Sequence, residues 1–265
     1  MHETGIELRE IVVRRGDTTA LDDVSLLFPA GKTTVILGPS GSGKSTLLKV
    51  AAGIAFPDSG RVFINGKNLN TMSVRENNAF RRDSGFIFQD SALWSNSTIQ
   101  QNLSLPLRFH YPALTDEEIA RRVDAFVKRV GFHESLAHRP AESSSGERKI
   151  ISFIRALVTN PSLLYMDEPL TGIDHQVAER MTEMIRELKR EARTIIIVTH
   201  DPVLTSQLAD YLVVLDRGRL LEFGSLTQVV KSTRAEVIAI LSRVLSEAST
   251  FDGSILELLD QGFGM

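Results

Sequence analysis

The hydrophobic pattern begins with alternation and then changes period. Residues Ile6 to Val13 and Val24 to Phe28 alternate apolar and polar side chains, which is the period of a half-buried strand. Thr33 to Leu37 is a continuous β-branched and apolar run, typical of a buried strand. From Ser45 to Ala52 the apolar residues recur at helical spacing. A buried strand, a glycine-rich loop and a helix in this order predict the start of a parallel α/β domain.

The middle of the chain, from about residue 92 to 160, has few β-branched runs. Between Thr115 and Val130 the residues Ile119 and Val123 fall on one face of an amphipathic helix. Thr115 followed by Glu118 matches a capping box at the start of that helix. We interpret this stretch as a helical lobe inserted into the α/β core.

The α/β pattern then resumes towards the C-terminal end. Strands are predicted at 163–166, 194–198, 211–215 and 219–223, with a helix at about 176–190. Beyond Ser225 the chain looks helical, with apolar residues for packing at Val229, Val230, Val237, Ile238, Leu241, Val244 and Leu245. We predict one α/β domain over 6–225, with its core at 6–89 and 161–225 and the helical lobe at about 90–160. A helical extension over 226–265 follows.

Composition narrows the class of protein. The chain has 265 residues, 42% of them hydrophobic, with a net charge of −3, so no excess positive charge invites nucleic acid as the main partner. No segment reaches the roughly 18–20 apolar residues that cross a bilayer, and the charged stretch from Met1 to Glu7 lacks the apolar run of a signal peptide. Cysteine is absent, which fits the cytosol. We therefore expect membrane contact only through another protein.

One glycine-rich segment carries the clearest chemistry. It matches G-x-x-x-x-G-K-S/T in full, between a strand and a helix: Gly38, Pro39, Ser40, Gly41, Ser42, Gly43, Lys44 and Ser45. Its glycines let backbone N–H groups approach a phosphate without a Cβ clash, and the helix that follows adds its positive end. We expect Lys44 to reach the β- and γ-phosphates of ATP and the Ser45 hydroxyl to bind Mg²⁺, with Thr46 a further candidate contact. The alternative is a Gly/Ser turn beside a surface lysine.

Two adjacent carboxylates end a later apolar strand. Leu163 to Met166 leads into Asp167 and Glu168. Since side chains alternate along a strand, these two carboxylates point different ways. We predict that Asp167 holds the Mg²⁺, usually through water, and that Glu168 is the general base for the attacking water. The alternative is a solvated turn.

With these motifs in place the chain resembles an ABC-type ATPase over about residues 6 to 225. That family has a P-loop NTPase core of RecA-like parallel sheet with an antiparallel β lobe and an inserted helical subdomain. The resemblance implies that Gln89 touches Mg²⁺ and links the site to the helical lobe. It also implies that His200 is the switch histidine that contacts the γ-phosphate and that Asp174 works across a dimer interface. Each of these residues, taken alone, is more often structural.

The family's signature stretch, Leu-Ser-Gly-Gly-Gln, is altered here. Ser144 and Gly146 match and Glu147 follows them, while Ser143 replaces the leucine and Ser145 the first glycine. The resemblance implies that this segment contacts the γ-phosphate held by the partner subunit. The Cβ of Ser145 stands where close backbone approach is expected, which predicts a weaker closed dimer. Without the family, the segment is a polar start of a helix.

Two further features bear on nucleotide and cargo. Arg15 stands where the family usually places an aromatic residue against adenine; it either stacks on the base or is a solvated loop charge. The chain resembles most the ATPases of lipid-trafficking permeases of the Mce and lipid-asymmetry type. The features that suggest this branch are Arg15, the stretches 89–94 and 102–107, and the helical tail. Trp94 would then lie in the lobe that faces the permease.

The resemblance implies a homodimer of ATP-hydrolysing subunits bound to integral membrane permease subunits on the inner face of the cell membrane. Two alternatives stay open. One is a soluble ABC ATPase in nucleic-acid or ribosome work, which co-purification with ribosomes or DNA would favour. The other is a regulatory module that binds ATP with little turnover, which the altered Ser143–Ser145 segment encourages and the presence of Glu168 opposes. Phosphate release from the purified protein separates these alternatives.

Overall fold

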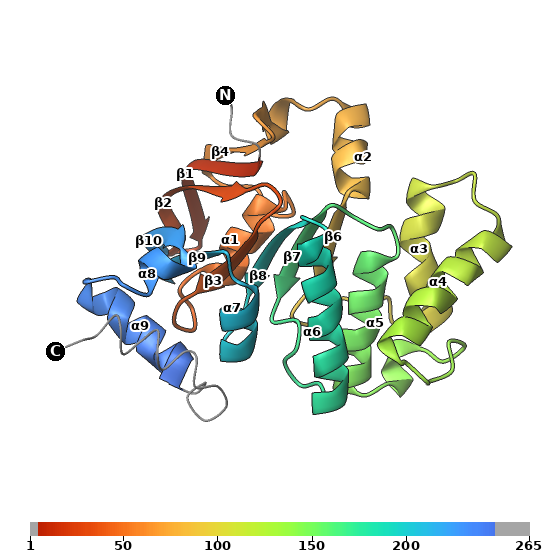
Figure 1. Ribbon diagram of the computed structural model, residues 1–265. Helices are drawn as coiled ribbons and strands as arrows, with labels where there is room; N and C mark the ends of the chain where they lie inside the picture. Colours follow the sequence, from red (N-terminus) through yellow and green to blue (C-terminus); the bar gives the residue numbers. More distant parts are fainter. Residues whose placement is uncertain (1–4, 247–265) are drawn as a thin grey trace. The chain divides into compact units, whose positions relative to one another are not determined.

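The computed structural model describes residues 5–246 and falls into two compact units (Figure 1). Unit 1 comprises residues up to Met72 together with those from Ala192 onwards. Unit 2 comprises Ser73–Glu191. The predicted boundaries at 89, 161 and 225 stay predictions. Residues 247–265 of the predicted extension lie outside the described part of the chain.

Unit 1 contains an antiparallel sheet in the order β2-β1-β4-β5. Its strands are β1 (Gly5–Arg15), β2 (Thr18–Pro29), β4 (Ser59–Ile64) and β5 (Lys67–Asn68). In this sheet Ile6 pairs with Phe28 on one side and with Ile64 on the other. The register of β1 with β2 shifts at three places, and at the first of them, between Leu8 and Ile11, Glu10 takes a left-handed φ of 51° and the predicted alternation breaks. This bulge leaves both Leu8 and Ile11 buried.

The second set of strands in unit 1 is built around β3 (Thr33–Leu37), which is buried along its whole length. β3 pairs in parallel with β8 (Thr194–Val198) and with β9 (Tyr211–Asp216), and β10 (Arg219–Ser225) is antiparallel to β9. All four strands were predicted from their patterns. The helices of this unit are α1 (Lys44–Ala51), α7 (Pro202–Leu208), α8 (Leu226–Val229) and α9 (Ala235–Ser246), with the 3₁₀ turn η1 (Leu69–Thr71).

Unit 2 combines a parallel strand pair with helices. β6 (Ser84–Ile87) pairs in parallel with β7 (Leu163–Asp167). The helices are α2 (Val74–Arg82), α3 (Ile99–His110), α4 (Asp116–Val130), α5 (Ser145–Leu157) and α6 (His175–Arg190), with the 3₁₀ turn η2 (Pro140–Glu142). Helices α3, α4 and α5 pack on one another. The helical lobe and the α/β fold class predicted from the sequence are both confirmed.

Local sequence explains where several of these helices begin and end. In the predicted capping box of α4, the Glu118 N–H donates to Thr115 Oγ1 at 3.2 Å and the Thr115 N–H donates to Glu118 Oε2 at 2.8 Å. α4 ends at Gly131, whose φ of 72° favours glycine. The sequence analysis did not assign β4, β6, α2 or α3. The hydrophobic pattern does not predict α2, because Phe80 is the one residue of this helix that is buried and a single apolar position has no period.

Asn102 of α3 holds the loop that carries Trp94. Its side chain is 1% exposed. Asn102 Oδ1 accepts from the Trp94 N–H at 2.8 Å, and Nδ2 donates to the Trp94 carbonyl at 3.1 Å and to the Thr98 carbonyl at 3.0 Å. Within residues 5–246 no helix is both long and apolar enough to cross a membrane.

We predict that Asn102→Ala lowers the free energy of unfolding by about 3 kcal/mol, because it removes the hydrogen bonds of a buried amide and leaves the backbone groups of Trp94 and Thr98 without these partners. Urea denaturation measures the change. The matched control is Gln100→Ala, two residues away on α3, whose amide makes one long 3.4 Å contact with Ser104. That substitution shifts stability by less than about 0.5 kcal/mol. Equal shifts in the two variants would contradict the role assigned to Asn102.

Candidate functional site

The glycine-rich loop of unit 1 joins β3 to α1. At two of its positions, backbone atoms from other strands come so close that only glycine fits. A Cβ built on Gly38, which has a φ of 155°, would lie 2.1 Å from the Leu215 carbonyl oxygen. A Cβ on Gly43, with a φ of 100°, would lie 2.4 Å from the Ala20 carbonyl oxygen. Any other residue at either position therefore displaces the loop.

Lys44 lies along the inside of this loop. Its side chain is 7% exposed, and its ammonium group donates to the carbonyl oxygens of Gly38 and Pro39, each at 2.8 Å. Gly43 caps α1 without a side-chain hydrogen bond, and the first turn of α1 contains no acidic residue. The positive end of α1 and the Lys44 charge therefore face the loop without a neighbouring carboxylate from that turn, an arrangement that suits a phosphate.

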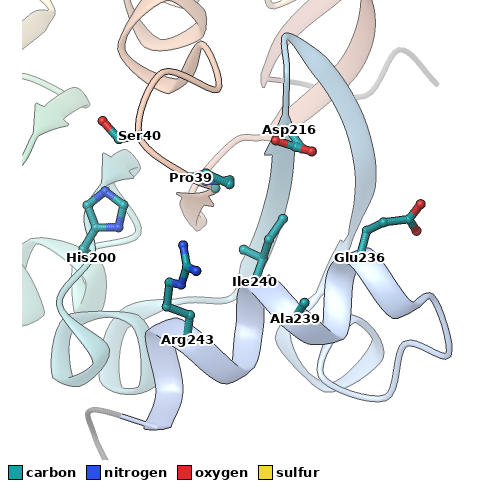
Figure 2. A pocket seen from close by; sticks show the side chains of 9 residues that line it. Pro39, Ser40, His200, Asp216, Glu236, Ala239, Ile240 and Arg243 are labelled. Carbon is teal, nitrogen blue, oxygen red and sulfur yellow. The ribbon is translucent and has the colours of Figure 1, made fainter.

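His200 lies at the same cleft as the start of the loop. It follows β8 and is exposed. Together with Gly38, Pro39 and Ser40 it lines a cleft of about 440 Å³ (Figure 2). The next residue, Asp201, caps α7 through Oδ1, which accepts from the Val203 N–H at 2.8 Å and so holds the chain directly after His200. Unit 1 thus brings together two of the sequence-predicted groups, the loop and the histidine.

Arg15, the remaining candidate in unit 1, is the exposed last residue of β1. Its carbonyl oxygen accepts from the Thr18 hydroxyl at 2.9 Å, which closes the turn into β2. This turn places Arg15 at the end of a strand. Stacking of the Arg15 side chain on adenine stays a prediction.

In unit 2 the two predicted carboxylates differ in burial and in backbone conformation. Asp167 is the last residue of β7 and is 1% exposed. Glu168 lies beyond the strand with a φ of 49°, a left-handed conformation that is uncommon for a residue with a side chain. Glu168 Oε2 accepts from the Thr171 hydroxyl at 3.2 Å. The backbone therefore leaves the extended conformation of β7 at Glu168, and such a conformation is typical of functional sites.

A buried lysine that the sequence analysis missed lies beside Gln89. Lys149 of α5 is 4% exposed and donates from Nζ to the Gln89 carbonyl oxygen at 2.5 Å and to that of Phe88 at 3.2 Å. Burial lowers the pKa of Lys149, while the carboxylates of Asp167, Glu168 and Asp90 oppose that shift. Lys149 therefore holds the Gln89 segment from α5, and it does so near the carboxylates of Asp167, at the end of β7, and Glu168, just beyond it.

Arg155, two turns further along α5, holds the next part of the same segment. Its guanidinium donates to the carbonyl oxygens of Ser91 at 3.0 Å and Ala92 at 2.8 Å. Ser91 and Ala92 both have left-handed φ angles, 66° and 45°. Lys149 shares helical spacing with buried Phe153 and Ala156, so a cation within an apolar stripe was the signal available in the sequence.

The Ser144–Glu147 segment forms the start of α5. The Glu147 N–H donates to Ser144 Oγ at 3.2 Å and the Ser144 N–H donates to Glu147 Oε2 at 2.6 Å, so the two residues form a capping box. A Cβ on Gly146 would lie 3.0 Å from the Gly172 carbonyl oxygen, which places this helix start against the segment before Asp174. Asp174 itself caps α6, with Oδ1 accepting from the Val177 N–H at 3.1 Å.

The donor set that the motifs predict for Mg²⁺ consists of oxygen atoms. Hydroxyl and carboxylate oxygens such as those of Ser45 and Asp167 fit a hard cation. Among the residues the structure describes, no three His, Cys, Asp or Glu side chains gather into a metal cluster. Oxygen donors of this kind suit Mg²⁺, which commonly keeps water and phosphate oxygens among its ligands.

Comparisons with known proteins agree with this arrangement. The sequence model of the family described as ABC transporter matches residues 21–171. The chain is 34% identical over 252 residues to the sulfate/thiosulfate import ATP-binding protein of Mycobacterium tuberculosis, covering 95% of this chain and 69% of that protein. It is 35% identical over 222 residues to a methionine import ATP-binding protein of Rhodopseudomonas palustris, covering 83% and 59%. A solved ATP-binding cassette, a dimer in a post-hydrolysis state with ADP and Pi, superposes with a TM-score of 0.77 at 30% identity, covering 83% and 98%.

We predict that Lys149→Met lowers ATP turnover about tenfold while changing KM less than threefold, because it frees the backbone at Gln89 and leaves the phosphate loop intact. Hydrogen exchange at residues 88–92 rises in the same variant. Lys128→Met on α4, where the lysine is exposed, is the matched control and leaves both measurements unchanged. If hydrogen exchange at residues 88–92 and ATP turnover in Lys149→Met both equal those of the wild type, Lys149 does not position the Gln89 segment.

Proposed function

Since the chain belongs to the ABC transporter family, we propose that it is the ATP-binding, ATP-hydrolysing subunit that energises a membrane transporter. The observation that carries the proposal is the phosphate loop, in which the backbone approaches of Gly38 and Gly43 leave no room for side chains while Lys44 lies buried along it. Loops of this kind serve to hold a triphosphate.

In this proposal the loop from Gly38 to Thr46 binds the phosphates, with Lys44 at the β- and γ-phosphates. The Ser45 hydroxyl, the Asp167 carboxylate and Gln89 would hold Mg²⁺. A Mg²⁺ ion held there would neutralise charge on the phosphates. The buried position of Asp167 and the oxygen-only donor set support these assignments.

Glu168 is the general base in this mechanism. Its carboxylate orients a water molecule and takes its proton as the water oxygen attacks the γ-phosphorus, and the bond from that phosphorus to the β-phosphate oxygen breaks. His200 donates to the γ-phosphate as charge develops. The left-handed backbone at Glu168 supports its role, since uncommon backbone conformations of this kind cluster at functional sites.

We predict that Glu168→Gln keeps nucleotide affinity within about threefold of the wild type and lowers turnover by at least 100-fold, because the amide keeps the shape but does not accept a proton. Steady-state phosphate release and binding of a labelled ATP analogue are the measurements. Lys44→Ala is the companion variant, in which analogue affinity itself falls. Full turnover in Glu168→Gln excludes the base role, and undiminished affinity in Lys44→Ala excludes the nucleotide site.

We also propose that two copies of the chain act together, each Ser144–Glu147 segment reaching the nucleotide held by the other copy. The dimeric post-hydrolysis cassette supports pairing of this kind. In this chain the Ser144 side chain is already engaged at the start of α5, and Ser145 adds a Cβ next to it. Both features favour a closed dimer that is weaker than one built on a glycine pair.

A cleft of about 600 Å³ in unit 2 suits the permease contact. Its walls include Trp94, Leu105 and Phe109, and Trp94 and Phe109 are 62% and 71% exposed. Exposed aromatic residues around an apolar cleft favour a short amphipathic helix as the occupant. We propose that a cytoplasmic helix of the permease docks here, which would keep the subunit on the inner face of the membrane.

We predict that the double variant Trp94→Ala/Phe109→Ala loses the permease on gentle detergent extraction and keeps wild-type affinity for ATP, because the cleft contains none of the proposed nucleotide contacts. Phe56→Ala is the matched control, since Phe56 of unit 1 is 73% exposed and lies outside the cleft. The proteins that co-purify are identified by mass spectrometry. Retention of the permease by the double variant would place its docking site elsewhere.

Cargo is chosen by the membrane partner. The lipid-trafficking branch inferred from Arg15 and the stretches after Gln89 stays a prediction that the comparisons do not support. The two relatives described above bear the names of sulfate/thiosulfate and methionine import. Identification of the substrates that co-purify with the native complex distinguishes these classes of cargo.

A further inference from the structure

Helix α9 forms the second wall of the cleft at the phosphate loop. Glu236, Ala239, Ile240 and Arg243 line it, opposite Pro39 and Ser40 (Figure 2). These four positions follow the spacing i, i+3, i+4 and i+7, so they make up one face of α9. None of the motifs that identified the nucleotide site includes this helix.

The opposite face of α9 is anchored within unit 1. Val237 and Leu241 are 0% and 1% exposed, and α9 packs on β10. The turn that leads into α9 is tied to the same strand, because the Arg234 guanidinium donates to the Leu221 carbonyl and the Ser232 hydroxyl donates to Glu222. These contacts fix the position of α9, and with it the face of the helix that points towards the phosphate loop.

Charge is distributed unevenly along the cleft. In Figure 2 the Arg243 side chain extends from α9 towards the phosphate loop, on the side of the cleft where His200 lies, while Glu236 and Asp216 lie on the other side. One end of the cleft thus combines a guanidinium, an imidazole and the start of the phosphate loop. A phosphate group fits that end, because a guanidinium offers paired N–H donors to phosphate oxygens.

We propose that Arg243 is a phosphate-contacting residue, which binds the terminal phosphate of the nucleotide from the same chain that supplies the phosphate loop. The inference rests on the proposed nucleotide role of that loop. It assigns α9 to the ATP site and gives the chain a contact that distinguishes a triphosphate from a diphosphate. ADP lacks the phosphate that Arg243 reaches, so α9 contacts bound ATP through Arg243 but not bound ADP.

The test measures binding of Mg²⁺–ATPγS and Mg²⁺–ADP to the full chain by calorimetry. Arg243→Ala lowers the affinity for ATPγS about tenfold or more and leaves the affinity for ADP within twofold, because a charge-assisted contact to the third phosphate is lost. Arg243→Lys, which keeps the charge but not the paired donors, falls between the wild type and Arg243→Ala. Lys231→Ala, an exposed charge outside α9, and Ser242→Ala, next to Arg243, leave both affinities unchanged.

Two results would overturn the assignment. One is wild-type affinity for ATPγS in Arg243→Ala. The other is an equal loss for ATPγS and ADP, which would mean that the substitution disturbs the loop in general. Lys44→Ala separates this outcome from failure of the underlying proposal: if it binds both nucleotides as the wild type does, the loop itself is not the nucleotide site.

Discussion

The site in unit 1 depends on the contact of two glycines with backbone carbonyl groups. Gly38 lies against the Leu215 carbonyl and Gly43 against the Ala20 carbonyl, and neither approach leaves space for a Cβ. The first contact reaches β9 and the second reaches β2. The loop is therefore held between the two sets of strands in unit 1, and its backbone is shaped before any ligand arrives. Lys44, His200 and α9 are all placed relative to that preformed loop.

Unit 2 depends in a similar way on one helix. The first turn of α5 forms the altered signature segment, its buried Lys149 holds the backbone at Gln89, and Arg155 holds the residues that follow. Any displacement of α5 therefore moves the signature segment and the Gln89 segment together. Because the Gln89 segment continues towards Trp94 and the proposed permease cleft, α5 offers a physical connection between nucleotide state and a membrane partner.

The altered signature segment and the position of α9 suggest where this chain differs within its family. Ser145 adds bulk at a helix start that Gly146 already packs closely against Gly172. Arg243 would add a cationic contact at the phosphate end of the cleft. With a weaker contact between subunits and an added contact within one subunit, binding of ATP would depend less on the partner subunit and more on the residues of the chain that holds the nucleotide.

The sequence by itself determined the elements whose causes are local. The spacing of glycines, lysine and serine in the phosphate-loop motif, the β-branched run of β3 and the Thr115–Glu118 capping box each lie within a few residues, so pattern and spacing were enough to predict them. Most of the candidate site residues were named from the same motifs. The bulge at Glu10 and the left-handed backbone at Glu168 were not visible, because alternation says nothing of where a strand turns.

Only the tertiary structure decided which distant groups meet. Lys149 contacts the backbone of Gln89 from a different helix, and Arg243 approaches the phosphate loop from the last helix described. Arg243 has an ordinary appearance in the sequence, and the apolar stripe around Lys149 indicates that this lysine is buried but not what it contacts. Their partners are set by how buried residues such as Phe153 and Leu241 pack their helices against the strands, and such long-range packing has no signature at any fixed spacing along the chain.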